Sequence, residues 1–181
     1  MRYQRTQRPP QQVVIPSPRP WPTGARDAVA MCAWVVIVVA AGAMMGVLFP
    51  PGEWYQTLGK PTWTPPSWLF GPVWTMLYVL LGLGAWLVGR EPGAAAAADR
   101  PRAWLAFGVM AVLMLAWTPL FFGLQSPALA FVDIALLWGV LLWMTMVFGR
   151  VRPMAGYLQL PLVCWVSFAL VLNGTIWLIN A

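Results

Sequence analysis

Residues 28–49 read AVAMCAWVVIVVAAGAMMGVLF, an apolar run that contains no charged side chain. A helix of roughly 20 such residues is long enough to cross the hydrocarbon core of a lipid bilayer. Four more apolar runs of similar length follow, at residues 67–88, 103–123, 127–148 and 155–179. Prolines and charged residues gather in the connections, where they end helices. The sequence therefore predicts an all-α fold, an integral membrane bundle of five transmembrane helices.

The composition of the 181-residue chain fits a membrane protein and disfavours several function classes. Hydrophobic residues make up 60% of it and charged residues only 9%, whereas soluble domains are about a quarter charged. The chain has no His, which is the commonest metal ligand and general base. Its two cysteines, Cys32 and Cys164, lie far apart in apolar runs and form no zinc or redox motif. We therefore expect no catalytic residues, no metal site, no obligatory cofactor and no enzyme activity.

Residues 1–26 differ from the rest of the chain in composition. They hold five Arg and six Pro, and a segment of this kind cannot bury a core. We expect a disordered N-terminal tail over residues 1–26 and a transmembrane domain over residues 27–181. The tail lacks the apolar core and the cleavage site of a signal peptide. Its arginines alone do not indicate nucleic-acid binding, so no nucleic-acid partner is expected.

The distribution of basic residues predicts the orientation in the membrane. With five spans, the N-terminal tail and the second and fourth connections lie on one side, and they carry ten of the eleven Lys and Arg residues. Lys60, in the first connection, is the only basic residue on the other side. Connections rich in Lys and Arg remain in the cytoplasm. We expect a multi-pass protein of a bacterial cytoplasmic membrane with its N-terminus inside.

The first connection, residues 53–68, reads EWYQTLGKPTWTPPSW. It is too polar to span a bilayer and is unusually aromatic for a linker. Its prolines restrict the backbone, which favours a rigid lid over one end of the bundle. The alternative is a belt of aromatic residues that anchors the loop at the membrane interface. A belt needs no such density of prolines, so we favour the lid.

Three of the predicted helices carry large side chains at the spacing that places them on one helix face. These stripes are Trp74 and Tyr78, then Met110, Met114 and Trp117, and then Trp165, Ala169, Asn173 and Trp177. Such stripes on several helices can line a cavity for a flat apolar ligand, although each stripe alone is more often simple helix packing. An unpaired amide in lipid is costly, so Asn173 is expected to face the bundle and to hydrogen-bond another helix.

Two further features of the spans allow a functional or a structural interpretation. Asp133 is the only acidic residue inside a predicted span, and such residues mark functional sites by default. It lies near the start of its span, so structural pairing or a side chain that reaches the interface is the simpler interpretation. Gly42 and Gly46 form a small-xxx-small pattern, which indicates helix contact and only weakly indicates dimerisation.

Four motifs follow one another along the chain. They read WYxxLxKPxWxPP at residues 54–66, FxxVWxxLY at 70–78, WxPLFFG at 117–123 and PxxxWxxFAxxLNxxIxxxN at 161–180. In this order they resemble the TspO/MBR family, the tryptophan-rich sensory proteins also called translocator proteins or peripheral-type benzodiazepine receptors. The resemblance covers residues from about 28 to 181.

The resemblance implies five transmembrane helices, a homodimer, and binding of porphyrins such as protoporphyrin IX and haem. It also implies binding of benzodiazepine-type and isoquinoline carboxamide drugs, and contact with membrane lipid. With Met114, which shares a face with Trp117, the expected ligand-binding residues are Tyr55, Trp74, Tyr78, Met114, Trp117, Ile134, Trp165 and Ala169. Porphyrin or another flat apolar small molecule is thus the expected ligand.

The third span departs from the family pattern. Relatives usually read Gln-x-x-x-Asn-x-x-Trp there, whereas this chain has Met110 and Met114 before Trp117. The usual Tyr after Pro161 is also replaced, by Leu162. Thioethers are adaptable, so we expect a softer pocket with weaker discrimination for carbonyl-bearing drugs. A Met sulfur that ligates haem iron is a less favoured alternative.

The resemblance leaves a sensor, a transporter and a porphyrin-degrading enzyme to compare. An energised transporter normally carries several ionisable groups within its spans, and here Asp133 stands alone. An enzyme needs acid–base or nucleophilic groups that this chain does not offer. We therefore favour a sensory or regulatory porphyrin-binding protein, with a transporter of porphyrin or lipid as the alternative.

Overall fold

The computed structural model describes residues 22–181, and every regular element in that range is helical. Five helical segments are long and apolar enough to cross a membrane, which confirms the predicted all-α bundle of five spans. The elements are α1 (Ala25–Leu48), α2 (Glu53–Thr57), α3 (Ser67–Arg90), α4 (Ala94–Thr118), η1 (Pro119–Gly123), α5 (Pro127–Val151), α6 (Pro153–Tyr157) and α7 (Leu160–Ile179).

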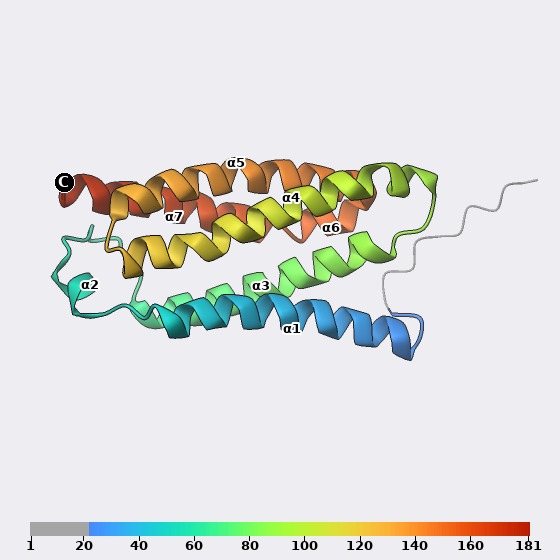
Figure 1. The fold of residues 1–181 in the computed structure, drawn as a ribbon, viewed down its shortest axis with the longest axis horizontal. Helices are drawn as coiled ribbons and strands as arrows, with labels where there is room; N and C mark the ends of the chain where they lie inside the picture. Colours follow the sequence, from blue (N-terminus) through green and yellow to red (C-terminus); the bar gives the residue numbers. More distant parts are fainter. Residues whose placement is uncertain (1–21) are drawn as a thin grey trace, which may run out of the picture.

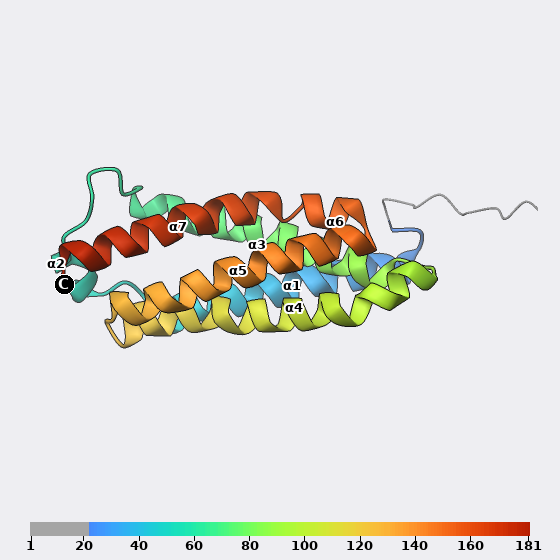
Figure 2. The ribbon, with the colours of Figure 1, turned by 90° about the horizontal axis from the view of Figure 1, so that it is seen from above.

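The helices form two layers (Figures 1 and 2). One layer holds α1 and α3 side by side, and the other holds α4, α5 and α7. The first loop with α2 and the C-terminus lie at one end of the bundle, which we call the lid end. The α3–α4 and α5–α6 connections and the start of α1 lie at the opposite end, which we call the basic end.

The structure defines several element boundaries more closely than the sequence did, and it shows that the alanine run 94–98, a helix extension or a linker by its composition, is helical. Helix α1 begins at Ala25, so the last two residues of the predicted tail are helical, while residues 1–21 lie outside the described range. The alanine run 94–98 is the first turn of α4. This helix ends in the π-helical turn η1, a geometry that is frequent at functional sites. The fifth span is interrupted between α6 and α7 at Leu158 and Gln159.

Polar side chains tie helices together at the basic end, and one ion pair among them, Glu91–Arg152, joins the two layers. The Asp27 carboxylate pairs with Arg90 at 2.9 Å and accepts a hydrogen bond of 3.0 Å from the Trp86 indole. The Arg90 guanidinium also lies over the Trp86 ring, 4.4 Å from its centroid. Glu91 pairs with Arg152 at 3.0 Å. These contacts join α1 to α3, and the end of α3 to the α5–α6 junction.

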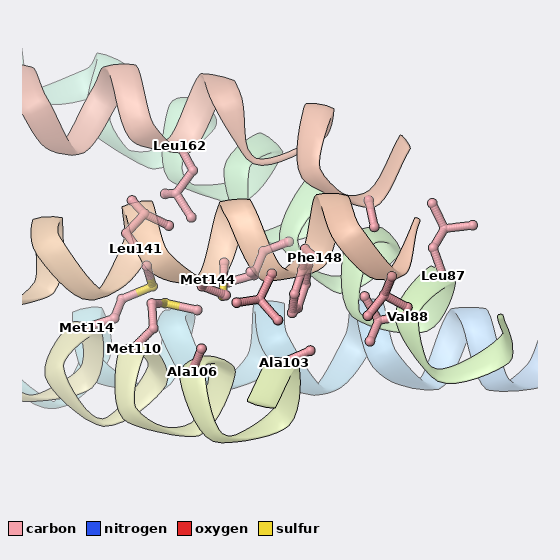
Figure 3. Close-up of a cluster of buried hydrophobic side chains, with 14 of the residues drawn as sticks. Leu87, Val88, Ala103, Ala106, Met110, Met114, Leu141, Met144, Phe148 and Leu162 are labelled. Carbon is pink, nitrogen blue, oxygen red and sulfur yellow. The ribbon is translucent and has the colours of Figure 1, made fainter. Parts of the chain in front are cut away.

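The half of the bundle next to the basic end is closely packed. Figure 3 shows buried side chains of the core, which come from α3 of one layer and from α4, α5 and α7 of the other. Trp34 of α1 stacks on Trp104 of α4, with ring centroids 5.1 Å apart. Gly84 lets α3 approach the second layer, because an added Cβ there would lie 2.1 Å from Gln159 Nε2. The two layers therefore touch throughout this half.

Candidate functional site

The half of the bundle next to the lid end contains a cavity of about 500 Å³ between the two layers. Side chains from α1, α3, α4, η1, α5, α7 and the first loop line it, and most of them are apolar or aromatic. Small-molecule sites in proteins typically measure roughly 300–1,000 Å³ and have this kind of lining. The cavity is thus large enough for one ligand of drug or cofactor size.

All eight residues that the sequence singled out line this one cavity. They are Tyr55, Trp74, Tyr78, Met114, Trp117, Ile134, Trp165 and Ala169. The structure therefore brings together residues from the first loop and from four helices. That these residues contact a ligand stays a prediction.

An aromatic network forms the wall built by α3 and α7. Trp74 stacks on Tyr78 with centroids 5.4 Å apart, as their four-residue spacing predicted. Trp165 meets Trp74 edge to face at 6.4 Å and Phe70 at 5.8 Å. Edge-to-face and offset-stacked pairs are the arrangements that aromatic rings prefer. The network holds the ring faces in place at the edge of the cavity.

Asn173 of α7, which is 2% exposed, connects this wall to α4 and α5. Its Oδ1 accepts a hydrogen bond of 2.9 Å from Trp117 Nε1, and its Nδ2 donates one of 2.8 Å to the Pro127 carbonyl. The prediction that Asn173 faces the bundle and bonds other helices is confirmed. Because the indole N–H is occupied by Asn173, Trp117 offers the cavity its ring rather than its donor.

Helix α1 contributes a side of the cavity that sequence reasoning missed. Val39, Gly42, Ala43 and Gly46 line it. An added Cβ at Gly42 would lie 2.1 Å from the Tyr78 ring, so the small residue makes room for an aromatic side chain of α3. The small-xxx-small pattern was a sequence signal for close contact, but a pattern of small residues does not identify its partner.

The first loop covers the cavity. Trp54 packs against Phe121 at 5.7 Å, Tyr55 against Phe122 at 5.5 Å, and Trp63 against Phe168 of α7 at 5.9 Å. This packing of the loop onto the bundle agrees with the lid interpretation. Trp68, at the start of α3, is 71% exposed and fits the alternative role of an interface anchor.

Tyr55 is the lid residue that borders the cavity. Burial raises the pKa of its phenol above the ordinary value, so the side chain is neutral near pH 7. Lys60 Nζ lies 4.6 Å from the Tyr55 ring centroid and donates a hydrogen bond of 3.1 Å to the Leu58 carbonyl. The lid thus carries one positive charge close to the mouth of the cavity.

Comparison with known proteins identifies the family. The TspO/MBR family model matches residues 33–178. The chain is 36% identical over 157 residues to "Tryptophan-rich protein TspO" of Chlorobaculum tepidum, covering 83% of this chain and 94% of the relative. It is 37% identical over 139 residues to human "Translocator protein", covering 75% and 82%. The chain belongs to the TspO/MBR family.

"Protein CrtK" of Rhodobacter capsulatus is similar as well, 36% identical over 148 residues that cover 81% of this chain and 90% of that one. None of these three names is that of an enzyme. The resemblance found in the four sequence motifs is therefore confirmed at the level of the TspO/MBR family.

The two methionines of α4 that depart from the TspO/MBR pattern have different environments. Met114 lines the cavity. Met110 is fully buried and is not part of the lining; it points into the core beside Met114 and Leu141 (Figure 3). Both methionines were predicted on the helix face of Trp117, but Met110 does not reach the cavity, because it lies one helical turn, roughly 5–6 Å, farther from the lid along α4.

Two buried polar atoms near the lid end have no hydrogen-bond partner among residues 22–181. One is Trp165 Nε1, on a residue that lines the cavity. The other is Asp133 Oδ2, on a side chain that is 7% exposed and outside the lining. None of the ion pairs between described residues involves Asp133. The predicted structural pairing of Asp133 is therefore not found among the described residues, and the alternative that its side chain reaches the membrane interface stays a prediction.

Proposed function

We propose that this TspO/MBR-family protein is a membrane sensory or regulatory protein that binds porphyrins, such as protoporphyrin IX and haem, or related flat apolar molecules. The observation that carries the proposal is the cavity of about 500 Å³ lined by ring faces from α3, α4 and α7. Flat conjugated molecules stack favourably on Trp and Tyr rings. The lid shields such a ligand from water.

The polar groups of the site suit a ligand with an apolar body and an acidic edge. Lys60 on the lid supplies a positive charge beside Tyr55, and porphyrin carboxylates would lie toward that end. The described residues thus fit porphyrin as a ligand.

We also propose that the protein is a homodimer in a bacterial cytoplasmic membrane with its N-terminus inside. The orientation is supported by the basic connections at one end of the bundle and, within residues 22–181, by Lys60 alone at the other. A reporter enzyme fused after Ala181 tests it, since only a reporter that works outside the cytoplasm is expected to be active.

Transport of porphyrin or lipid is the alternative function, and "Translocator protein" is the name of several relatives. Asp133 is the only acidic residue within the apolar runs 28–49, 67–88, 103–123, 127–148 and 155–179. A single carboxyl group does not make a relay for coupled transport. The structure of the spans therefore gives more support to a binding protein than to an energised transporter.

Titration of the purified full-length protein with protoporphyrin IX, haem and a carotenoid, following Trp fluorescence, tests the proposal. Porphyrin is expected to quench Trp fluorescence saturably at one site per chain, because Trp74, Trp117 and Trp165 border the cavity. Absence of saturable quenching by both porphyrins in folded protein contradicts porphyrin binding. Saturation by the carotenoid alone moves the assignment to another class of apolar ligand.

A further inference from the structure

Asn180, the residue that follows α7, joins the last helix to the first loop through two hydrogen bonds. Its Oδ1 accepts one of 2.9 Å from the Gly59 N–H, and its Nδ2 donates one of 2.9 Å to the Gly59 carbonyl. The same Nδ2 donates a third bond of 2.7 Å to the Ile176 carbonyl of α7. The carboxamide therefore pairs with the loop backbone at one point and is anchored to its own helix at another.

Only a carboxamide at position 180 makes this set of bonds. Asn provides both an acceptor and two donors, whereas Asp provides acceptors alone when ionised. An Asp side chain would keep the bond from the Gly59 N–H but would place a charge against two carbonyl oxygens. The pattern of partners thus explains why Asn stands here.

On the loop side of this contact, Gly59 leaves no space for a side chain. An added Cβ would lie 2.6 Å from Ile179 Cγ2 and 3.4 Å from Asn180 Oδ1. Such a Cβ would push the loop off the end of α7. The close approach of the loop to the side chains of Ile179 and Asn180 therefore depends on a residue without a side chain at position 59.

The contact between Gly59 and Asn180 joins the first loop to the layer on the other side of the cavity. The first loop connects α1 to α3, which belong to the same layer, and the cavity lies between that layer and the other one. Among residues 22–181, the bonds to Asn180 are the hydrogen bonds that tie this loop to the opposite layer. Other loop bonds, such as Lys60 Nζ to the Leu58 carbonyl, are internal. Figures 1 and 2 show the loop reaching the end of α7.

We propose that the Asn180 side chain is a latch that fixes the first loop over the cavity, and that release of this latch controls how fast ligand enters and leaves. The inference rests on the proposed function, because it assumes that the cavity takes a ligand. Asn180 is a positioning residue in this scheme: it touches the lid and does not touch the cavity, whose lining does not include it.

The latch is tested first without any ligand. Amide hydrogen exchange of protein labelled with ¹⁵N-glycine follows the Gly59 N–H directly. Asn180→Ala is expected to raise its exchange rate roughly tenfold, the loss expected for two hydrogen bonds, and Asn180→Asp to raise it less. Thr175→Ala is the matched control, since that hydroxyl bonds only within α7. Unchanged exchange at Gly59 in Asn180→Ala overturns the latch.

A rescue pair tests the same contact from the other side. Gly59→Ala is expected to open the loop and to expose the neighbouring amides, because of its clash with Ile179 Cγ2. Gly59→Ala combined with Ile179→Ala removes the clashing methyl group and is expected to restore protection. Equal protection in Gly59→Ala and in the wild type shows that the close approach has no role and contradicts the proposal.

Stopped-flow mixing with protoporphyrin IX, read by Trp quenching, tests control of access. Asn180→Ala is expected to raise both the association and the dissociation rate roughly tenfold, with a much smaller change in Kd. Unchanged rates, with Gly59 exchange raised, contradict the gating role. If the wild type shows no quenching, the proposed function and the gating role fail together, and the exchange experiment still decides whether Asn180 holds the loop.

Discussion

The two ends of the bundle are built from the same helices but packed in opposite ways. At the basic end, the Glu91–Arg152 ion pair and the stacked rings of Trp34 and Trp104 join the layers. At the lid end, the layers separate around a cavity and are bridged by a loop. We call the half next to the basic end the closed half and the half next to the lid end the open half. The difference indicates that packing in the closed half stabilises the fold, while the open half provides the space for a cavity.

The largest expected effect lies at a glycine of the closed half. Gly82→Val places a side chain where an added Cβ is already 2.7 Å from Val35 Cα, a backbone atom that cannot turn aside. Overpacking of this kind costs about 1–3 kcal/mol or more, so the thermal midpoint in detergent is expected to fall clearly.

The matched control is Gly46→Ala, on the part of α1 that lines the cavity, where no atom lies within 4 Å of an added Cβ. This change is expected to leave the midpoint unchanged or slightly raised, since Ala favours helix. Equal destabilisation by both changes contradicts the division into a closed and an open half.

The next effect concerns affinity and belongs to the open half. Trp165→Ala removes a ring that meets Trp74 and Phe70, and is expected to weaken protoporphyrin IX binding by about 1–3 kcal/mol, the scale of stacked aromatic contacts. Trp165→Phe keeps an aromatic ring and is expected to retain more of the affinity than Trp165→Ala. Trp104→Phe, in the closed half, is expected to bind as the wild type does. If it weakens binding as much as Trp165→Ala, the site lies elsewhere.

The next prediction compares Met110 and Met114, which lie one helical turn apart on α4. Met114→Asn puts an amide in the cavity and is expected to strengthen binding of an isoquinoline carboxamide drug by about 0.5–1.5 kcal/mol, the net value of one hydrogen bond. Met110→Gln buries an amide in the core and is expected to lower the thermal midpoint without any gain in drug affinity. If Met110→Gln raises drug affinity and Met114→Asn does not, the claim that the cavity reaches Met114 but not Met110 is wrong.

The smallest expected effect is a pH dependence of the folding stability, caused by Tyr55 in the lid. Because burial raises the pKa of Tyr55, the folded protein holds this proton more tightly than the unfolded chain does. The associated stability is complete below about pH 10, the usual pKa of Tyr, and is lost as the pH rises through the folded value. The ring is only half-buried, so solvent screening limits the effect to about a few tenths of a kcal/mol. Comparing thermal midpoints of the wild type and Tyr55→Phe between pH 9 and pH 11 isolates this contribution.

The sequence predicted the spans and the composition of the cavity wall because both depend on local patterns. Apolar length defines a span, and four-residue spacing placed Trp74 on Tyr78 and put Trp165 and Ala169 on one face. The contribution of α1 was not predictable, since Gly42 only shows that something approaches closely. The depth of Met110 depended on where the cavity floor lies, which is set by packing between layers.

The latch could not be read from the sequence for a similar reason. Gly59 and Asn180 are 121 positions apart, and neither residue type is unusual at the end of a loop or a helix. Only the three-dimensional approach of the loop to α7 gives the carboxamide its partners. Long-range contacts that involve a single side chain leave no periodic pattern to detect.

The proposal that the cavity binds porphyrin is tested most directly by a substitution that fills the cavity with a side chain. Ala169 is a small residue in its lining, and Ala169→Phe places a ring where the ligand is proposed to lie. Ala135→Phe, at an exposed position of α5, is the matched control for an added ring. Titration with protoporphyrin IX is expected to show no saturable quenching in Ala169→Phe and wild-type affinity in Ala135→Phe. Wild-type affinity in a folded Ala169→Phe variant would contradict the claim that this cavity is the porphyrin site.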